Sequence, residues 1–234
     1  MKTAMILAAG RGERMRPLTD HTPKPLLQVG GKPLIVWHIE RLAAAGYTRI
    51  VINHAHLGAQ IESALGNGAA WGVSIVYSRE ETALETAGGI ATALALIDAE
   101  IFPVVNGDVF VEYDFLQLAA PMHLVASDGA KMHLVLVDNP SQHPQGDFVL
   151  RGGRVVEGDG DKLTFSGIGV YHRTLFADVP PHTKAPLVPL LRAAIAAGQA
   201  SGEHYHGRWV DVGTPERLQQ LDEILRNPLQ SDHV

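Results

Sequence analysis

The stretch Leu7-Ala-Ala-Gly-Arg-Gly-Glu-Arg-Met-Arg-Pro-Leu-Thr-Asp-His-Thr-Pro-Lys-Pro25 decides how this sequence is interpreted. It begins inside an apolar run, Thr3–Ala9, which predicts a strand that ends in small residues. Gly10 and Gly12 follow at once, and glycine adopts backbone conformations that let N–H groups point inward at anionic oxygens. A strand followed by such a turn is typical of a loop that binds a polyphosphate.

Positive charge is concentrated in the same stretch, where Arg11, Arg14 and Lys24 can neutralise phosphate oxygens. The loop matches neither familiar phosphate-binding motif. A dinucleotide fingerprint needs a third glycine where Met15 stands, and a Walker loop needs Gly-Lys-Ser/Thr. For the Gly-x-Gly pattern alone, a tight surface turn with solvated arginines is the favoured alternative. The whole nineteen-residue string reverses that preference and indicates phosphate binding.

Composition limits the classes of protein to which this chain can belong. The 234 residues are 46% hydrophobic and 19% charged, which suits one globular domain with a sizeable core. The formal net charge of -6 supplies no broad positive field for nucleic acid or anionic lipid. The chain has no cysteine, and therefore no disulfide or thiolate nucleophile. No apolar run reaches the roughly 20 residues of a membrane helix, and Ala4–Ala9 is too short for a signal peptide, so we expect a soluble cytoplasmic protein.

Outward from the loop, short apolar runs typical of strands alternate with helical patterns. Repeated β-α units predict an α/β fold with a right-handed, doubly wound, mostly parallel sheet of Rossmann type. Ligands of such a sheet bind at the carboxyl ends of its strands. The predicted strands are Thr3–Ala9, Arg49–Asn53, Val73–Ser78 and Phe102–Asn106, and the predicted helices are one from Pro33 to Gly46, one at Leu57–Leu65 and one at Ile90–Ile97 after Gly88–Gly89.

The second half of the chain changes character, because its strand-like runs are separated by turns rich in Gly, Pro and Asp instead of long helices. We expect antiparallel additions there, with strands at Met132–Val137, Phe148–Leu150, Val155–Val156 and Leu163–Tyr171 and helices at Leu187–Ala197 and after Thr214–Pro215. No low-complexity linker divides the chain. We therefore expect one domain over 1–234, with a nucleotide-binding lobe at 1–120, a sugar-binding lobe at 121–227 and a cleft between them. The tail after Asn227 is expected to fray.

The nineteen-residue string resembles the start of the sugar-phosphate nucleotidyltransferase family, whose members carry Leu-Ala-Ala/Gly-Gly-x-Gly-x-Arg-Met/Leu-x-Pro-Leu-Thr and then Pro-Lys-Pro. The resemblance implies a Rossmann-like, GT-A-like nucleotidyltransferase fold with an antiparallel sugar-binding addition. It also implies that Gly10, Arg11 and Gly12 bind the triphosphate, that Arg14 stabilises the departing pyrophosphate and that Lys24 contacts the phosphates near the reacting phosphorus. Preorganised cations are the main help a protein gives to such a transfer.

Two aspartates resemble the metal-binding residues of that family. Asp108 ends Val104-Val-Asn-Gly-Asp, and Asp211 lies in Trp209-Val-Asp-Val-Gly-Thr-Pro215. Carboxylates from two distant positions can hold one Mg²⁺ and leave coordination positions for the two reacting phosphates. As isolated residues, both would be read as caps of a turn or a helix. Beside the N-terminal string, we favour magnesium.

The resemblance assigns base recognition to the loop before the third predicted helix. There Glu80 can read the polar edge of a base, and Gly88 lets a flat base lie against the backbone. For Gly89, a helix start that needs glycine for packing is the alternative. Glu85 stands where many relatives have glycine. The sugar-binding residues that the resemblance implies are Asn139, Gly146, Glu157 and Gly167.

Twelve histidines include two pairs at two-residue spacing, His54/His56 and His204/His206. This spacing places each pair on one strand face, but the sequence places no third metal ligand beside either. We interpret both pairs as ordinary surface or edge-strand histidines.

The sequence therefore predicts a magnesium-dependent enzyme that joins a nucleoside triphosphate to a sugar 1-phosphate, with small-molecule substrates and no nucleic-acid or membrane partner. Within the family, the order of motifs resembles most the bacterial uridylyltransferases that act on N-acetylmuramate 1-phosphate in cell-wall recycling. Mannose 1-phosphate guanylyltransferases and glucose 1-phosphate transferases are the alternatives. From other classes, the alternatives are an inactive regulatory module that binds nucleotide sugars and a nicotinamide-dependent dehydrogenase, which the absent third glycine disfavours.

Overall fold

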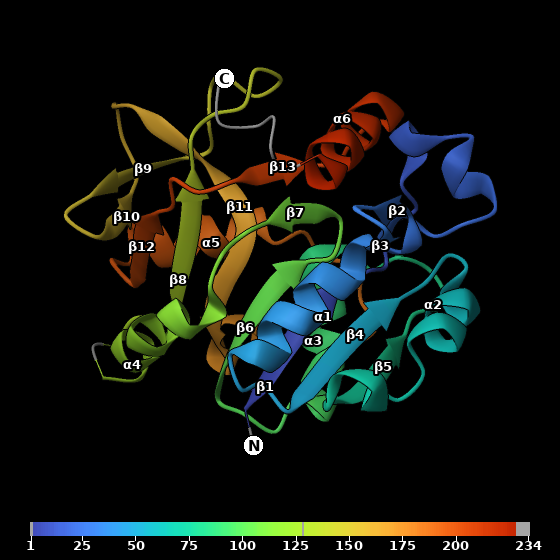
Figure 1. Ribbon diagram of the computed structural model, residues 1–234. Coiled ribbons are helices and arrows are strands. Elements are labelled where there is room, and N and C mark those ends of the chain that lie inside the picture. Colours follow the sequence, from blue (N-terminus) through green and yellow to red (C-terminus); the bar gives the residue numbers. More distant parts are fainter. Residues whose placement is uncertain (1, 128, 228–234) are drawn as a thin grey trace.

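A computed structural model describes residues 2–127 and 129–227 of the chain. Both halves contribute strands to a single nine-stranded sheet (Figure 1). Its strands, in spatial order, are β5 (Ser74–Arg79), β4 (Arg49–His54), β1 (Thr3–Leu7), β6 (Ile101–Asn106), β11 (Lys162–His172), β8 (Met132–Val137), β12 (Ala200–His204), β10 (Arg154–Val156) and β9 (Phe148–Arg151). The expected α/β fold with a mostly parallel central sheet is confirmed.

The first half forms the parallel part of the sheet, since β5, β4, β1 and β6 all run in one direction. Helices connect them as predicted: α1 (Leu34–Ala44), α2 (Gly58–Leu65) and α3 (Glu85–Ala93). The predicted start of the third helix, at Ile90, was wrong. The helix α3 begins at Glu85 and contains both glycines that were expected to precede it. The 3-10 helices of the structure are Glu13–Met15, Leu18–Asp20, Lys24–Leu26, Ala69–Trp71, Leu94–Leu96, Phe115–Leu118 and Arg173–Phe176.

Helices cover both faces of the sheet, with α1 in front of the strands and α3 and α5 (Val188–Ala196) behind them in Figure 1. The alternation of side chains along β1 shows how this arises. Ala4 and Ile6 pack into the cluster that contains α1, whereas Met5 packs into the cluster that contains α3 and α5. Successive residues of a strand point to opposite faces, so a fully apolar strand is buried on both.

The second half adds β11, which pairs antiparallel with both β6 and β8. The hairpin of β9 and β10 lies at the far edge of the sheet. The predicted antiparallel addition is therefore present, but β12 was not predicted. It runs parallel to β8, and the sequence of Ala200–His204 contains no β-branched residue, so its pairing comes from tertiary context. The remaining elements are α4 (Ala119–Ser127) and the two-stranded sheets β7 (Val109–Val111) with β13 (Trp209–Asp211) and β2 (Gln28–Val29) with β3 (Lys32–Pro33).

The last helix, α6 (Pro215–Arg226), begins as predicted, with the Thr214 hydroxyl accepting a hydrogen bond from the N–H of Arg217. Its Leu221 is buried with Met15 and Val29 from the segment after β1. The final helix thereby packs against the loop that begins the chain. In the described part of the chain, no helix has the length and apolar composition needed to cross a membrane. The tail expected to fray after Asn227 lies outside the described residues.

Candidate active site

The predicted phosphate loop lies where parallel strands β1, β4 and β6 end. The ends of these strands, the loop after β1 and the start of α3 line a cavity of about 220 Å³, cavity 1. Gly10, Gly12, Lys24 and Asp108 are among its lining residues, and nothing lies within 4 Å of the position that a Cβ would take at Gly10. The edge of the sheet at which a ligand was expected is therefore hollow and lined by four of the predicted residues.

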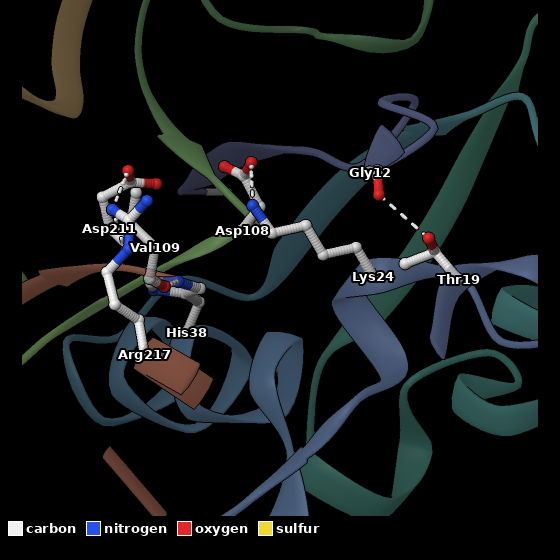
Figure 2. A network of polar contacts seen from close by, with 8 residues as sticks. All are labelled: Gly12, Thr19, Lys24, His38, Asp108, Val109, Asp211 and Arg217. Carbon is white, nitrogen blue, oxygen red and sulfur yellow. Dashed lines mark hydrogen bonds and ion pairs between the residues drawn. The ribbon is translucent and has the colours of Figure 1, made fainter. Parts of the chain in front are cut away.

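Lys24 and Asp108 form an ion pair, with 2.7 Å between Lys24 Nζ and Asp108 Oδ2 (Figure 2). Lys24 is 5% exposed, and a buried ammonium is costly unless a carboxylate or phosphate compensates it. The Asp108 side chain remains 44% exposed, so the pair has one buried and one accessible member. The sequence predicted both residues separately, and the fold brings them together.

Gly12 is required by the shape of the loop. Its φ of 65° lies in the left-handed region, and a Cβ there would lie 3.0 Å from Cγ2 of Thr19 and 3.2 Å from Cβ of Lys24. The Gly12 carbonyl accepts a hydrogen bond from the Thr19 hydroxyl at 2.9 Å (Figure 2). The loop is thus folded closely around the base of Lys24, which fixes where the ammonium emerges.

A second group of charges meets around Gly213. A Cβ at Gly213 would lie 3.1 Å from Arg14 Nη2, 3.0 Å from Asp211 Oδ2 and 2.9 Å from Arg217 Nη2. Arg217 Nη1 donates to Asp211 Oδ2 at 2.7 Å, as Figure 2 shows. Arg14, Lys24, Asp108 and Gly213 also line one cavity of about 220 Å³, cavity 4. The two predicted catalytic cations are therefore brought together, with Arg217 as a cation that sequence analysis missed.

The two predicted metal ligands share a cavity of about 290 Å³, cavity 3. In the register of β13 with β7, Asp211 lies opposite Val109, the residue after Asp108. Two carboxylates that open on one cavity fit Mg²⁺, which takes oxygen ligands and is bound in proteins through one or two carboxylates plus substrate phosphates. Each carboxylate is already paired with a cation, Lys24 or Arg217, so the local charge is balanced before a ligand binds.

His38 of α1 supports the strand that follows Asp108. Its Nε2 lies 2.7 Å from the carbonyl oxygen of Val109, and the ring is completely buried (Figure 2). Among the described residues its Nδ1 has no hydrogen-bond partner. Burial, opposed in part by the bond to Val109, lowers the pKa of His38 from 6.5 to about 4. The ring is therefore neutral at pH 7 and donates from Nε2 to the carbonyl.

Glu80 supports the loop of the site, and its contact with the polar edge of a base stays a prediction. It is 7% exposed, and its two oxygens accept hydrogen bonds from the Asn53 side chain at 2.7 Å and from the Leu84 N–H at 2.9 Å. Asn53 in turn accepts from the N–H of Ala8 at 3.0 Å. This chain of bonds joins the end of β1 to the loop before α3. Asn53 also lines cavity 1, although the sequence analysis did not select it.

The two glycines of α3 allow close packing. A Cβ at Gly88 would lie 2.2 Å from the carbonyl oxygen of Thr183, and the Gly88 N–H donates to the Ala185 carbonyl at 3.1 Å. A Cβ at Gly89 would lie 2.7 Å from the Asn53 amide nitrogen and 2.8 Å from Glu80 Oε1. The packing alternative thus describes what both glycines contact, while contact of Gly88 with a base stays a prediction.

Glu85 is the residue of this loop with a special backbone. Its φ is 59°, a left-handed conformation that favours glycine. Its side chain lies 3.3 Å from Lys184 Nζ and lines both cavity 1 and its neighbour, cavity 2. The left-handed φ gives a physical reason for the glycine that the family resemblance led us to expect at this place.

Cavity 2, of about 530 Å³, lies beside the first and is lined mainly by the second half of the chain. Two predicted sugar-binding glycines, Gly146 and Gly167, line it. Both have positive φ, and a Cβ at either would lie 2.7–2.8 Å from a neighbouring asparagine atom. Lys162 and Arg192 also line this cavity, and neither forms an ion pair with an acidic residue in the described part of the chain.

Three further predicted residues lie away from these cavities. Asn139 supports the turn beside cavity 2, since its amide donates to the Lys162 carbonyl at 2.8 Å and its oxygen accepts from the Thr164 hydroxyl at 2.8 Å. Glu157 is exposed after β10, and Arg11 pairs with Glu13 on the surface. Neither is among the residues that line cavities 1 to 4, so their substrate contacts stay predictions.

Comparison with protein families matches residues 3–148 to the family described as nucleotidyl transferase. An N-acetylmuramate alpha-1-phosphate uridylyltransferase from Neisseria meningitidis is 53% identical over 94% of this chain and 97% of its own length. A protein of the same name from Caulobacter vibrioides is 34% identical over 92% of this chain and 93% of its own length. A mannose-1-phosphate guanylyltransferase from Mycobacterium tuberculosis is 30% identical over 91% of this chain and 61% of its own length.

Among solved structures, a putative glucose-1-phosphate thymidylyltransferase from Bacillus anthracis superposes with a TM-score of 0.84. The match covers 97% of this chain and 96% of the other at 23% sequence identity, so it is a likeness of fold.

Proposed function

Because this chain belongs to the nucleotidyl transferase family, we propose that it transfers a nucleotidyl group from UTP to N-acetylmuramate 1-phosphate. The products are UDP-N-acetylmuramate and pyrophosphate. Relatives that carry the name of this activity are 53% and 34% identical to this chain, whereas the guanylyltransferase from Mycobacterium tuberculosis is 30% identical. We further propose that residues 1–120 form a nucleotide-binding lobe and residues 121–227 a sugar-binding lobe. The enzyme would act on small molecules in the cytoplasm, as part of cell-wall recycling.

One structural observation supports this proposal above the others, namely that cavities 1 and 2 are adjacent and share lining residues. Leu7, Glu85, Thr86 and Asn106 line both. The glycine loop, Lys24 and Asp108 line cavity 1, and cavity 2 has room for a sugar. A nucleoside triphosphate in the first and a sugar phosphate in the second would meet at these shared residues.

The reaction follows from that arrangement. An oxygen of the sugar phosphate attacks the α-phosphorus of UTP, and the bond from that phosphorus to the bridging oxygen of the β-phosphate breaks. Both reacting oxygens belong to phosphates, so no protein nucleophile is needed and the protein contributes by positioning and by charge. Lys24 neutralises the phosphates near the reacting phosphorus, and Arg14, in cavity 4, stabilises the charge that develops on pyrophosphate. Asp108 and Asp211 would hold Mg²⁺, which supplies further charge neutralisation.

Cavity 2 also supports the choice of acceptor. N-acetylmuramate differs from N-acetylglucosamine by a lactyl group with a carboxylate at the 3-oxygen. Lys162 and Arg192 offer cations without an acidic partner in the described chain, and the volume of about 530 Å³ admits the extra group. Both cations are exposed, so a lactyl carboxylate would gain charge-assisted hydrogen bonds from them that the analogue without this group cannot make.

The test is a comparison of kcat/KM for the two sugar 1-phosphates at equal UTP and magnesium, with pyrophosphate release as the signal. We expect a clear preference for N-acetylmuramate 1-phosphate and loss of that preference in Arg192→Ala. A preference for the sugar without the lactyl group, or for mannose 1-phosphate with GTP, would contradict the substrate assignment. Absence of pyrophosphate release with every pair would favour the inactive regulatory module.

A further inference from the structure

Three potential metal ligands meet on the surface at the junction of β8 and β12. They are Asp138, which follows β8, and His204 and His206 at the end of β12. One ligand atom from each lies within 4.8 Å of the others, and this is the one such group of three in residues 2–127 and 129–227. The sequence showed the two histidines at two-residue spacing, and the fold supplies the third ligand 66 residues away.

The strand register explains this meeting. β12 runs parallel to β8 with His204 opposite Leu136, so Asp138, two residues further on, returns to the same face. Between the histidines, Tyr205 donates its N–H to Leu136 and turns its ring toward Tyr113, at 5.3 Å between centroids. The alternation leaves the His204 and His206 rings together, with centroids 3.8 Å apart.

The distances suit an ion between the three groups. His204 Nε2 lies 2.9 Å from Asp138 Oδ1. Ligand atoms of a tetrahedral zinc site, at about 2.0–2.2 Å from the ion, are separated by roughly 3.3–3.5 Å. A small opening of the Asp138–His204 pair would therefore admit the ion. In the described chain His206 has the His204 ring as its contact and no hydrogen-bond partner, so its nitrogens are available.

The other histidine pair at this spacing shows the contrast. His54 is buried with Nε2 at 2.7 Å from Glu62, whereas His56 Nε2 lies 3.4 Å from the carbonyl oxygen of Thr19. His143 forms an exposed pair with Asp147 at 3.0 Å, but no third ligand lies beside it among the residues that the structure describes. Two-residue spacing or a single histidine–carboxylate pair thus does not produce a cluster of three.

We infer that Asp138, His204 and His206 form a second metal site, separate from the proposed magnesium site, which takes Zn²⁺ or a similar late first-row divalent ion. Two imidazoles and a carboxylate suit zinc better than magnesium, and three protein ligands leave a coordination position for water. The ion joins two segments that both lead into cavity 3. Asp138 is followed by Pro140 and Gln142, and His206 is followed by Trp209 and Asp211.

The test is a calorimetric titration of chelator-treated full-length protein with Zn²⁺ in excess Mg²⁺. We expect one zinc equivalent in the wild type. His204→Ala, His206→Ala and Asp138→Ala should each weaken binding at least about tenfold, since even loss of an outer partner of a metal ligand costs about 10–100-fold. His143→Ala, from the two-membered pair, is the matched control and should bind zinc like the wild type.

Hydrogen exchange supplies an independent measurement. Zinc should slow amide exchange in 138–147 of the wild type but not of His206→Ala, whose circular dichroism confirms that it is folded. The inference is overturned if the wild type binds no zinc in excess Mg²⁺, or if the His204→Ala and His206→Ala variants keep full affinity. It is equally overturned if zinc binding is lost in Asp211→Asn and retained in those two variants, which would locate the ion at the proposed magnesium site.

Discussion

At the scale of single residues, the charges of the site form two ion pairs, one between distant parts of the chain and one within a short segment. Lys24 meets Asp108, 84 residues away, and Arg217 meets Asp211 across the start of the last helix. Each pair consists of a cation suited to phosphate and a carboxylate suited to metal. A substrate that carries both phosphate and Mg²⁺ satisfies both members at once, whereas either component alone satisfies one.

The carboxylates can be tested by Asp108→Asn and Asp211→Asn. Each change removes a ligand charge with little change in volume, so both variants should fold and lose most magnesium-dependent turnover. Pyrophosphate release against magnesium concentration measures this, with circular dichroism as the check on folding. Asp20→Asn, which alters a surface partner of Arg16, is the control. Wild-type rates in Asp108→Asn or Asp211→Asn would refute the metal assignment.

Arg14 is expected to act in the transition state. Arg14→Ala should lower kcat by about 100-fold or more, because removal of one preorganised charge contact costs roughly 3 kcal/mol. Arg16 lies two residues away and pairs with Glu13 and Asp20 at the surface, so Arg16→Ala should stay near the wild-type rate. Steady-state kinetics of both variants decides the matter. An effect of Arg14→Ala on KM alone would mean that the residue only binds substrate.

The sequence identified residues of the site whose chemistry is carried by a continuous motif, such as Gly12 and Lys24. It did not identify Asn53 or Arg217. Asn53 is the second-last residue of β4, an ordinary apolar strand, and its role comes from Glu80, a partner on another loop. Arg217 could have been found, since the Thr214 cap places it in the first turn of a helix just after Asp211. Periodicity reports which face is buried but not which distant side chain lies opposite.

At the scale of elements, the start of α3 concentrates strain beside both cavities. A non-glycine residue in the left-handed region costs about 1–3 kcal/mol, and Glu85 has a φ of 59°. Glu85→Gly should therefore raise the free energy of unfolding by about 1 kcal/mol, after the entropy cost of glycine. It should also lower kcat/KM for the sugar phosphate, because the carboxylate lines both cavities.

Urea unfolding and steady-state kinetics together test the role of Glu85. Gly88→Ala is the comparison, since its Cβ would lie 2.2 Å from the Thr183 carbonyl oxygen and should lower stability. A less stable Glu85→Gly variant with normal kinetics would show that the residue serves the fold alone.

Helices and strands could be predicted where their local sequence alone determines their structure. The parallel strands are continuous apolar runs buried on both faces, and they were located almost to the residue. β12 has the sequence Ala-Ser-Gly-Glu-His and forms because β8 offers it a partner edge. The start of α3 was misplaced because its glycines look like a helix boundary, whereas they lie inside the helix where Asn53 and Thr183 approach closely.

At the scale of the whole molecule, His38 should make stability depend on pH. Its pKa is lowered in the folded protein to about 4, so the unfolded chain binds the proton more tightly. The stabilisation is fully present above pH 6.5 and is lost as the pH falls from 6.5 toward 4. His38→Gln keeps a donor for Val109 but does not titrate. Between pH 7.5 and pH 5, the wild type should lose about 2 kcal/mol more unfolding free energy than this variant in urea titrations. Equal losses would contradict the prediction.

The packing of α6 on the N-terminal loop has a consequence for biosynthesis. The cavity that holds Arg14 and Lys24 is completed by Gly213, and Met15 is buried by a helix that begins only at Pro215. A nascent chain on the ribosome can pair β1 with β4 early, but it cannot assemble this pocket until its last helix has emerged. We expect a nascent chain that lacks α6 not to bind nucleotide. Once α6 has emerged, the chain should gain nucleotide binding and these tertiary contacts in the same step.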